Sequence, residues 1–242
     1  MDLHIHTGAS PCAAKDMTPW NIVRMAQLEG LSLIAITDHN TAANAGAVME
    51  VGEKLGLAVL PGIEVQTREE VHLIAIFPTL EATLAFEEFI WRHLPDIRNR
   101  PEVFGQQILY DGEDRQIGSI ERLLLQSVTL RVEEVGAAII AHEGLTIAAH
   151  INRRSFGLIG QLGLVPGGLH LDAVELDRSF PYKRFAAEYA SLVDYPVLHS
   201  SDAHRLTDLV NGRRSAVLMR EISFTALRGL LESRDLQRIR FR

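Results

Sequence analysis

The chain has 242 residues, of which 47% are hydrophobic and 23% are charged, and its formal net charge is -7. This length and composition can bury the hydrophobic core of one α/β domain. The acidic balance argues against broad, nonspecific binding of nucleic acid, which usually needs a basic face. Cys12 is the only cysteine. A single cysteine excludes an intramolecular disulfide and indicates a reducing compartment.

The start of the chain has no basic segment followed by an apolar one, so we expect no cleaved leader. No apolar run approaches the ~20 residues of a membrane-spanning helix. We therefore expect a cytoplasmic protein that has no membrane partner.

The first third of the chain alternates predicted strands with predicted helices. A first strand covers residues 3–6, a helix begins at Thr18-Pro19 as N-cap and first-turn proline, and this helix runs to about Gly30. An apolar strand at 33–37 precedes a helix over 41–55, which Gly56 closes. The next predicted strand begins at 58–60 and passes through Pro61-Gly62 to 63–65, and another covers 71–77.

Residues from about 80 to 130 interrupt this rhythm. A helix is predicted at 84–94, followed by an irregular segment that contains one proline and several glycines. We interpret these residues as an insertion or lid within a single domain of residues 1–242.

The regular pattern then resumes. Helices are predicted at 129–142, 155–162, 182–192 and 224–231, and strands at 146–151, 173–176, 195–199 and 215–219. Alternating strands and helices indicate parallel βαβ units. About seven strands that run into polar residues favour a barrel, whose active site would lie at the carboxyl ends of the strands.

Histidines and carboxylates gather at the ends of these predicted strands. His4 and His6 lie two residues apart in a strand and so share one face. Asp202 and His204 repeat this spacing, and Glu64 has two oxygens with which to bridge two ions. Imidazole nitrogen and carboxylate oxygen bind divalent metals. Two such metals ~3.5–4 Å apart suit phosphoester hydrolysis by a metal-activated water.

Six ordered motifs resemble those of the PHP family, named for polymerase and histidinol phosphatase. They are DLHIHT at 2–7, TDHN at 37–40, PGIE at 61–64, His72, AH at 149–150 and SDAH at 201–204. The resemblance covers almost the whole chain. It implies a distorted (βα)7 TIM-like barrel with two or three divalent ions (Zn, Mn or Fe) at the carboxyl ends of the strands.

The resemblance also implies a ligand set. The first ion would be held by His4, His6, Glu64 and Asp202. Glu64 would bridge to a second ion, which His72 and His150 also hold, and a third ion would take His39 and His204. Cys12 stands where members usually carry an aspartate or histidine, and a thiolate there would favour a softer metal such as zinc. Asp2 and Asp38 would orient ligand histidines.

Four cations follow predicted strand ends or the first loop, where they would bind phosphate: Arg153, Arg178, Lys15 and Arg205. We therefore expect a metal-dependent phosphoesterase for a small phosphorylated substrate, either a phosphomonoester or a nucleotide. Glu64, Asp202 and His204 would be its catalytic residues.

Three alternatives stay open from the sequence. They are exonuclease-like hydrolysis of nucleic-acid ends, amidohydrolase-type hydrolysis of C–N bonds, and a non-catalytic metal-binding regulatory module. The short acidic chain favours a nucleic acid only as a short or nucleotide substrate.

Overall fold

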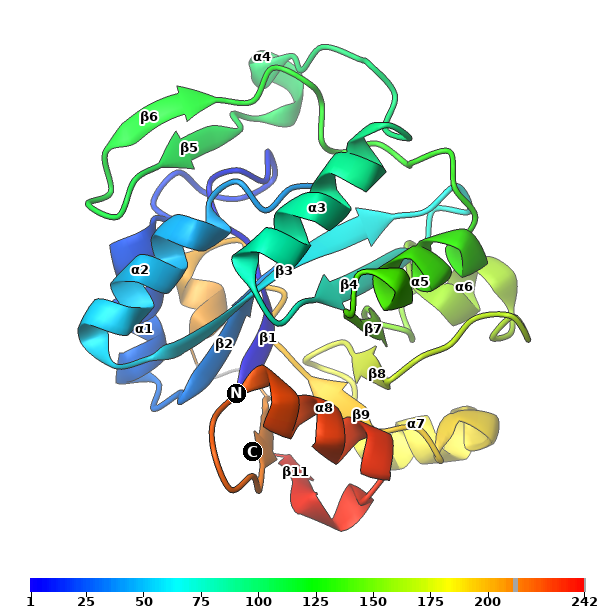
Figure 1. Ribbon diagram of the computed structural model, residues 1–242. Helices are drawn as coiled ribbons and strands as arrows, with labels where there is room; N and C mark the ends of the chain where they lie inside the picture. Colours follow the sequence, from blue (N-terminus) through cyan, green and yellow to red (C-terminus); the bar gives the residue numbers. More distant parts are fainter. Residues whose placement is uncertain (211–212, 242) are drawn as a thin grey trace.

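Strands and helices alternate over most of the chain in the computed structural model, which describes residues 1–210 and 213–241 (Figure 1). The other three residues of the predicted 1–242 domain lie outside the described residues. None of the helices within the described ranges is long and apolar enough to cross a bilayer.

The elements fall in the following order. The strands are β1 (Asp2–Ile5), β2 (Leu33–Ile36), β3 (Ala58–Gln66), β4 (His72–Ile76), β5 (Ile108–Tyr110), β6 (Gln116–Ser119), β7 (Leu145–Ala148), β8 (Ala173–Leu176), β9 (Val197–His199), β10 (Ser215–Val217) and β11 (Ile239–Phe241). The α-helices are α1 (Pro19–Leu28), α2 (Ala45–Leu55), α3 (Leu80–Trp91), α4 (Pro101–Phe104), α5 (Val132–Ala141), α6 (Leu158–Leu162), α7 (Tyr182–Glu188) and α8 (Phe224–Ser233). Short 3-10 helices are η1 (Ala190–Leu192), η2 (Leu206–Leu209) and η3 (Leu236–Arg238).

Seven strands form one curved sheet in the order β1-β2-β3-β4-β7-β8-β9. The chain after β9 returns to β1, where the His6 amide donates to the Ala203 carbonyl at 3.0 Å. A parallel bridge between Ile5 and Ala203 accompanies this bond. The sheet is therefore nearly closed, which confirms the predicted distorted TIM-like barrel.

The direction of β4 differs from the prediction of parallel strands throughout. β4 pairs antiparallel with both β3 and β7. A parallel partner needs a crossover of a dozen or more residues, whereas residues 67–71 connect β3 to β4 directly, and the Thr67 amide bonds to the Val71 carbonyl at 2.8 Å. His72 begins β4 instead of ending it, and the reversed direction brings it to the same end of the barrel as the other ligand-type residues.

The strand predicted to pass through Pro61 and Gly62 is continuous as β3. Two smaller expectations need correction. The strand predicted at 215–219 pairs with β11 in a separate two-stranded sheet, outside the barrel. Thr18 does not cap α1 through its side chain, and its hydroxyl donates instead to Asp114 at 2.5 Å.

The two faces of the sheet bury different hydrophobic clusters. One cluster packs between the strands and the helices around them, and includes Phe77, Phe86 and Ile139. The other contains Leu60, which shares the face of β3 that carries Glu64, because alternate residues of a strand share a face. Phe224 and Leu227 of α8 belong to this second cluster. Apolar packing thus fills the barrel below Glu64, and polar side chains occupy the opposite end.

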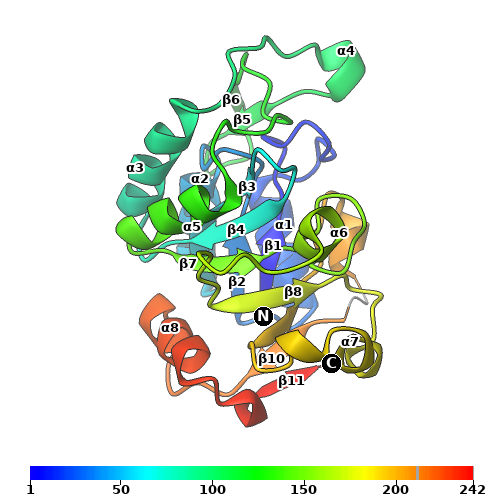
Figure 2. The ribbon, with the colours of Figure 1, turned by 90° about the vertical axis from the view of Figure 1, so that its right-hand side faces the viewer.

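Part of the irregular segment folds over the loop that follows β1. α4 and the hairpin β5–β6 lie together at one end of the molecule in both views (Figures 1 and 2). The Ile108 amide donates to the Gly8 carbonyl at 2.6 Å, and the Tyr110 hydroxyl donates to the Lys15 carbonyl at 2.7 Å. Gly105 has a φ of 100°, and a Cβ atom there would lie 1.9 Å from the Pro11 carbonyl oxygen. This segment therefore holds the loop that carries Cys12.

Gly105→Ala tests that contact, with Gly163→Ala as the matched control. Both glycines have positive φ, but a Cβ atom at Gly163 would have no neighbour within 4 Å. We expect Gly163→Ala to lower the free energy of unfolding by about 1–2 kcal/mol, the cost of a left-handed backbone. Gly105→Ala should lower it by about 1–3 kcal/mol more, because overpacking adds to that cost. Equal losses in urea unfolding would contradict the contact.

Candidate metal centre and active site

The Glu64 carboxylate lies at the centre of a buried histidine cluster. It comes from β3 and is only 1% exposed. Imidazole nitrogens from five different histidines lie 2.8–3.4 Å from its two oxygens: His4, His6, His39, His72 and His150. These histidines are carried by β1, β4 and the segments that follow β1, β2 and β7, so the cluster depends on the curvature of the whole sheet.

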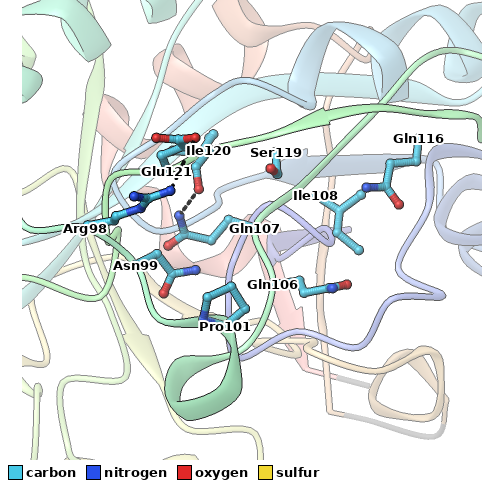
Figure 3. A pocket seen from close by; sticks show the side chains of 10 residues that line it. All are labelled: Arg98, Asn99, Pro101, Gln106, Gln107, Ile108, Gln116, Ser119, Ile120 and Glu121. Atoms are coloured by element: carbon cyan, nitrogen blue, oxygen red, sulfur yellow. Dashed lines mark hydrogen bonds and ion pairs between the residues drawn. The ribbon is translucent and has the colours of Figure 1, made fainter.

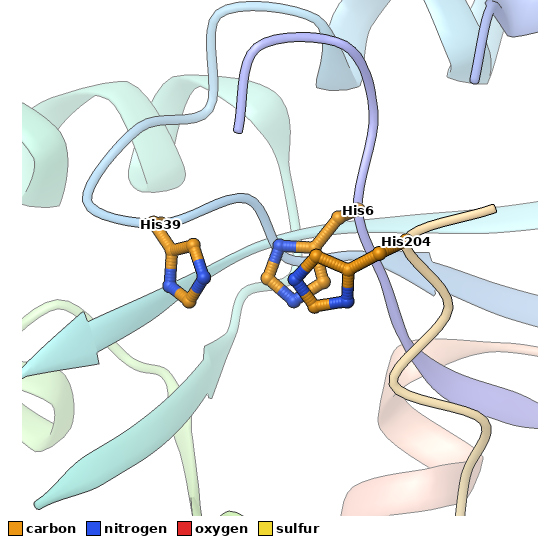
Figure 4. Close-up of side chains that lie close together, drawn as sticks. All are labelled: His6, His39 and His204. Carbon is orange, nitrogen blue, oxygen red and sulfur yellow. The ribbon is translucent and has the colours of Figure 1, made fainter. Parts of the chain in front are cut away.

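Three overlapping groups of side chains place their ligand atoms within 4.8 Å of one another. The first group is His4, His6, Glu64 and Asp202. The second is His39, Glu64 and His72, and the third is His6, His39 and His204. Figure 4 shows the rings of the third group side by side, and the ring centroids of His6 and His204 are 4.0 Å apart. These groups contain seven of the eight histidines and carboxylates named from the sequence, and the eighth, His150, lies 3.3 Å from Glu64 Oε1.

The donor set fits divalent cations better than a hydrogen-bond network. A carboxylate offers about four lone-pair sites, whereas five imidazoles surround Glu64. The Nε2 atoms of His4 and His6 face each other at 3.1 Å, and Glu64 Oε2 has no hydrogen-bond partner. Within the described part of the chain, no lysine or arginine forms an ion pair with Glu64. Cations between these atoms would satisfy the orphaned groups and offset the buried charge.

Electrostatics keep this carboxylate ionised. Burial alone would raise the pKa of Glu64, but His72, His4 and His39 hold that pKa well below its ordinary value. Burial likewise opposes ionisation of Asp202, and His4 together with the hydrogen bond from His6 keeps its pKa well below the ordinary value. Both groups are therefore available as anionic ligands at neutral pH.

Ser10 and Asp38 orient His6. The Ser10 hydroxyl lies 2.9 Å from His6 Nδ1 and donates to Asp38 at 2.6 Å. Asp38 also accepts hydrogen bonds from the amide and hydroxyl of Thr7. Because Ser10 contacts Nδ1 of His6, the other ring nitrogen, Nε2, is directed into the cluster. Hydrogen-bond partners of metal-binding histidines commonly orient the ring in this way.

Asp2 acts on the backbone instead. It accepts from the Ser201 amide at 3.0 Å and pairs with the buried Arg214 at 3.0 Å. Asp2 therefore stabilises the junction between β1 and the segment after β9, close to Asp202.

Glu175 was not singled out in the sequence, although it holds His4 in place. It lies in β8, is 2% exposed, and contacts His4 Nδ1 at 3.0 Å. It also accepts a hydrogen bond from the His150 amide at 3.1 Å. The signal that would have found it is an acidic residue inside an otherwise apolar strand, AVEL, since an isolated buried charge is costly.

Cys12 lies at the mouth of the cluster and is exposed. Desolvation of the thiol would raise its pKa, but His39 and His204 lower the pKa of Cys12 to about 6. A thiolate is the form that binds metal. Cys12 therefore stands next to the third group with the chemistry of a soft ligand.

A pocket of ≈ 430 Å³ opens directly onto the cluster. Besides ligand-type residues, it is lined by Gln66, Glu70, Leu125, Arg153 and Phe156. Of the four cations expected to bind phosphate, Arg153 lines this pocket, where it contacts Asp177 at 2.7 Å and Asp202 at 2.6 Å.

The other three cations lie elsewhere. Arg178 donates to the Asp208 carbonyl at 3.0 Å, while Lys15 and Arg205 are exposed, and none of the three lines the pocket. Of the four cations predicted to bind phosphate, Arg153 is therefore the one that lines the pocket beside the histidine cluster.

A second pocket, of ≈ 220 Å³, lies within the 98–121 segment (Figure 3). Its lining includes the amide side chains of Asn99, Gln106, Gln107 and Gln116, and Arg98 and Glu121 are its only charged residues. It contains no histidine or cysteine. Candidate metal ligands therefore line the first pocket and not this one.

Comparisons with known proteins agree with this geometry. The family model of the PHP domain matches residues 2–87, which contain five of the eight ligand-type residues. A 5'-3' exoribonuclease of Haemophilus influenzae is 25% identical over 120 residues, 46% of this chain and 43% of that protein. A phosphoribosyl 1,2-cyclic phosphate 1,2-diphosphodiesterase of Eggerthella lenta is 32% identical over 80 residues, 31% of this chain and 29% of that protein. The matched regions span less than half of these relatives' own lengths.

Solved structures share the fold along almost the whole chain. A lesion-specific endonuclease from Pyrococcus furiosus superposes with a TM-score of 0.71 and 22% identity, over 96% of this chain and 55% of the other. An amidohydrolase from Chromobacterium violaceum superposes with a TM-score of 0.60 and 18% identity, over 96% of both chains. Residues 2–87 thus match the PHP domain, and almost the whole chain shares the fold of these solved structures.

The role of Glu175 is tested by metal affinity. Glu175→Leu leaves His4 Nδ1 and the His150 amide without an acceptor, and we expect metal affinity to fall by about 10–100-fold. Glu175→Gln retains an acceptor oxygen and should lose less. Titration against a competing chelator measures the metal affinity of both variants, and far-ultraviolet circular dichroism checks that they fold. Unchanged affinity in the leucine variant would show that Glu175 does not position His4.

Proposed function

We propose that the protein is a metal-dependent phosphoesterase that hydrolyses a small phosphorylated substrate, either a phosphomonoester or a nucleotide. The observation that carries this proposal is the Glu64 carboxylate among five histidines at the floor of an open pocket. A buried donor set of this kind has no use in core packing, and its exposure to a pocket gives a substrate access to it.

The proposed ligands fall into three sites. His4, His6, Glu64 and Asp202 would hold the first ion. Glu64, His72 and His150 would hold a second, and the Nε2 atom of His150 lies 3.3 Å from Glu64 Oε1. His39 and His204, with Cys12 beside them, would hold a third. Two or three ions (Zn, Mn or Fe) bound here would activate a water molecule and neutralise charge on the phosphoryl oxygens.

The remaining roles belong to side chains that border the pocket. Arg153 lines the pocket with a planar guanidinium, which Asp177 and Asp202 hold through Nε and Nη1, and its other N–H groups would donate to phosphate oxygens. His204 is partly exposed at the mouth and is placed to give a proton to the leaving oxygen. Asp202 links Arg153 and His204, because its carboxylate contacts both side chains. The segment 80–130 acts as a lid, with Leu125 as its contribution to the pocket wall.

The presence of Arg153 favours a phosphoester over a neutral amide. A guanidinium in the pocket supplies charge-assisted donors for phosphate oxygens, whereas a neutral amide carries no charge for it to meet. Nuclease activity is named for one relative and for one solved structure of similar fold. The acidic net charge of this chain favours a small substrate instead.

Glu64→Gln tests the proposed function, with Glu121→Gln as control because Glu121 is 79% exposed. Removal of the central charge should lower hydrolysis by orders of magnitude and reduce metal content, while the barrel still folds. The assay is a panel of phosphomonoesters and phosphodiesters, before and after chelation and with Zn, Mn or Fe restored. Full activity of metal-free protein, or of Glu64→Gln, would contradict the proposal.

Arg153→Ala should raise KM for a phosphorylated substrate much more than it alters metal content. A charge-assisted bond contributes about 1.5–3 kcal/mol, which corresponds to about one to two decades in kcat/KM. Arg153→Lys should restore little, because lysine lacks the fork. Arg178→Ala is the control, since its guanidinium donates to a backbone carbonyl. An unchanged kcat/KM in Arg153→Ala, or a parallel loss of metal, would contradict phosphate binding by Arg153.

A further inference from the structure

The pocket wall beside the metal ligands includes an exposed aromatic ring. Phe156 is 38% exposed and lines the pocket. Its ring also stacks on His72, with centroids 4.5 Å apart and planes inclined by 22°. Leu125 contributes further apolar surface, and Gln66 and Glu70 contribute polar groups. The wall thus combines an apolar surface with a polar edge.

The backbone at Phe156 is held in an unfavourable conformation. Its φ is 63°, which is uncommon for a bulky residue and costs free energy. The loop around it is tightly wound, because a Cβ atom at either Gly157 or Gly160 would lie 2.3 Å from the Arg153 carbonyl oxygen. Such strain persists where the surrounding structure imposes it, and it gathers at binding sites. Here it presents a flat apolar ring to the pocket.

The same loop carries both Arg153 and Phe156, three positions apart. A guanidinium and an aromatic ring therefore border one pocket with the metal ligands. Its volume of ≈ 430 Å³ falls within the range of small-molecule sites, about 300–1,000 Å³. A polyol phosphate has no flat apolar face for this ring, whereas every nucleobase has one.

We propose that Phe156 determines specificity by stacking against the base of a nucleotide whose phosphate is hydrolysed at the metal centre. This inference rests on the proposed phosphoesterase function. Phosphate oxygens would meet Arg153, and the base would lie along Phe156 and Leu125. Gln66 and Glu70 would accept or donate hydrogen bonds at the edge of the base.

Kinetics on two substrates test this assignment. A nucleoside 5'-monophosphate carries a base, and glycerol 3-phosphate does not. Phe156→Ala and Phe156→Leu should lower kcat/KM for the nucleotide about tenfold or more, the order expected when a stacking aromatic is lost, and change it little for glycerol 3-phosphate. Phe156→Trp should retain the preference. Leucine keeps apolar bulk against His72, so it separates loss of stacking from loss of packing.

Phe241→Ala is the matched control, because Phe241 is 39% exposed and also contacts a histidine ring, His199, away from the metal centre. It should leave the nucleotide preference intact. Equal losses for both substrates in Phe156→Leu, or the same loss in Phe241→Ala, would overturn the assignment. A trinucleotide with a 5'-phosphate, assayed alongside, distinguishes a free nucleotide from a strand end as the source of the base.

Binding of an unphosphorylated nucleoside separates this inference from the proposed function. Calorimetry should detect nucleoside binding to the metal-loaded wild-type protein and about tenfold weaker binding to Phe156→Leu. Such binding without hydrolysis of any phosphoester would leave the stacking site standing and contradict the phosphoesterase. Hydrolysis without nucleoside binding, and without a preference for the nucleotide, would refute the role of Phe156 alone.

Discussion

The arrangement of the protein depends on one buried carboxylate. Glu64 is almost inaccessible to solvent and has five imidazoles within 3.4 Å. In a protein interior, an anion needs compensating charge or hydrogen bonds, and metal cations bound by the same imidazoles would supply that charge. The proposed role of the converging strands is to hold these groups in a geometry that can receive cations. Glu175, Ser10 and Asp38 stabilise the orientation of the surrounding rings.

The barrel brings this cluster to a single end of the sheet. Most ligand-type residues follow parallel strands, whose carboxyl ends lie together. His72 is the exception, and the antiparallel direction of β4 places its amino end at the same position. The opposite end is filled by apolar side chains of the strands and α8. The ligand-type residues and the apolar core therefore lie at opposite ends of the barrel. The 98–121 segment packs over the loop that carries Cys12, at the end with the ligand-type residues.

Much of this could be predicted from the sequence. Short apolar runs that end in histidine or carboxylate indicate strands with ligands, and the family resemblance implies the barrel and the ligand groups. The direction of β4 was missed because hydrophobic alternation is the same for parallel and antiparallel strands, and only the short connection at 67–71 distinguishes them. Glu175 was missed because it was interpreted as one more residue of a strand.

Phe156 lies at the start of the helix predicted at 155–162, whereas α6 begins at Leu158. Its positive φ accompanies tight contacts around Gly157, which the local sequence does not predict. The positions of Arg178, Lys15 and Arg205 outside the pocket likewise depend on tertiary structure.

The central claim is that Glu64 and its histidines hold metal ions, and locating those ions tests it most directly. Protein purified without chelator would be crystallised, and anomalous scattering collected at the absorption edges of zinc, iron and manganese. The account predicts two or three peaks, each within about 2–2.5 Å of its ligand atoms, with one pair of peaks on either side of the Glu64 carboxylate. Anomalous maps without a peak among His4, His6, Glu64 and Asp202, from protein shown to be active in the same preparation, would contradict it.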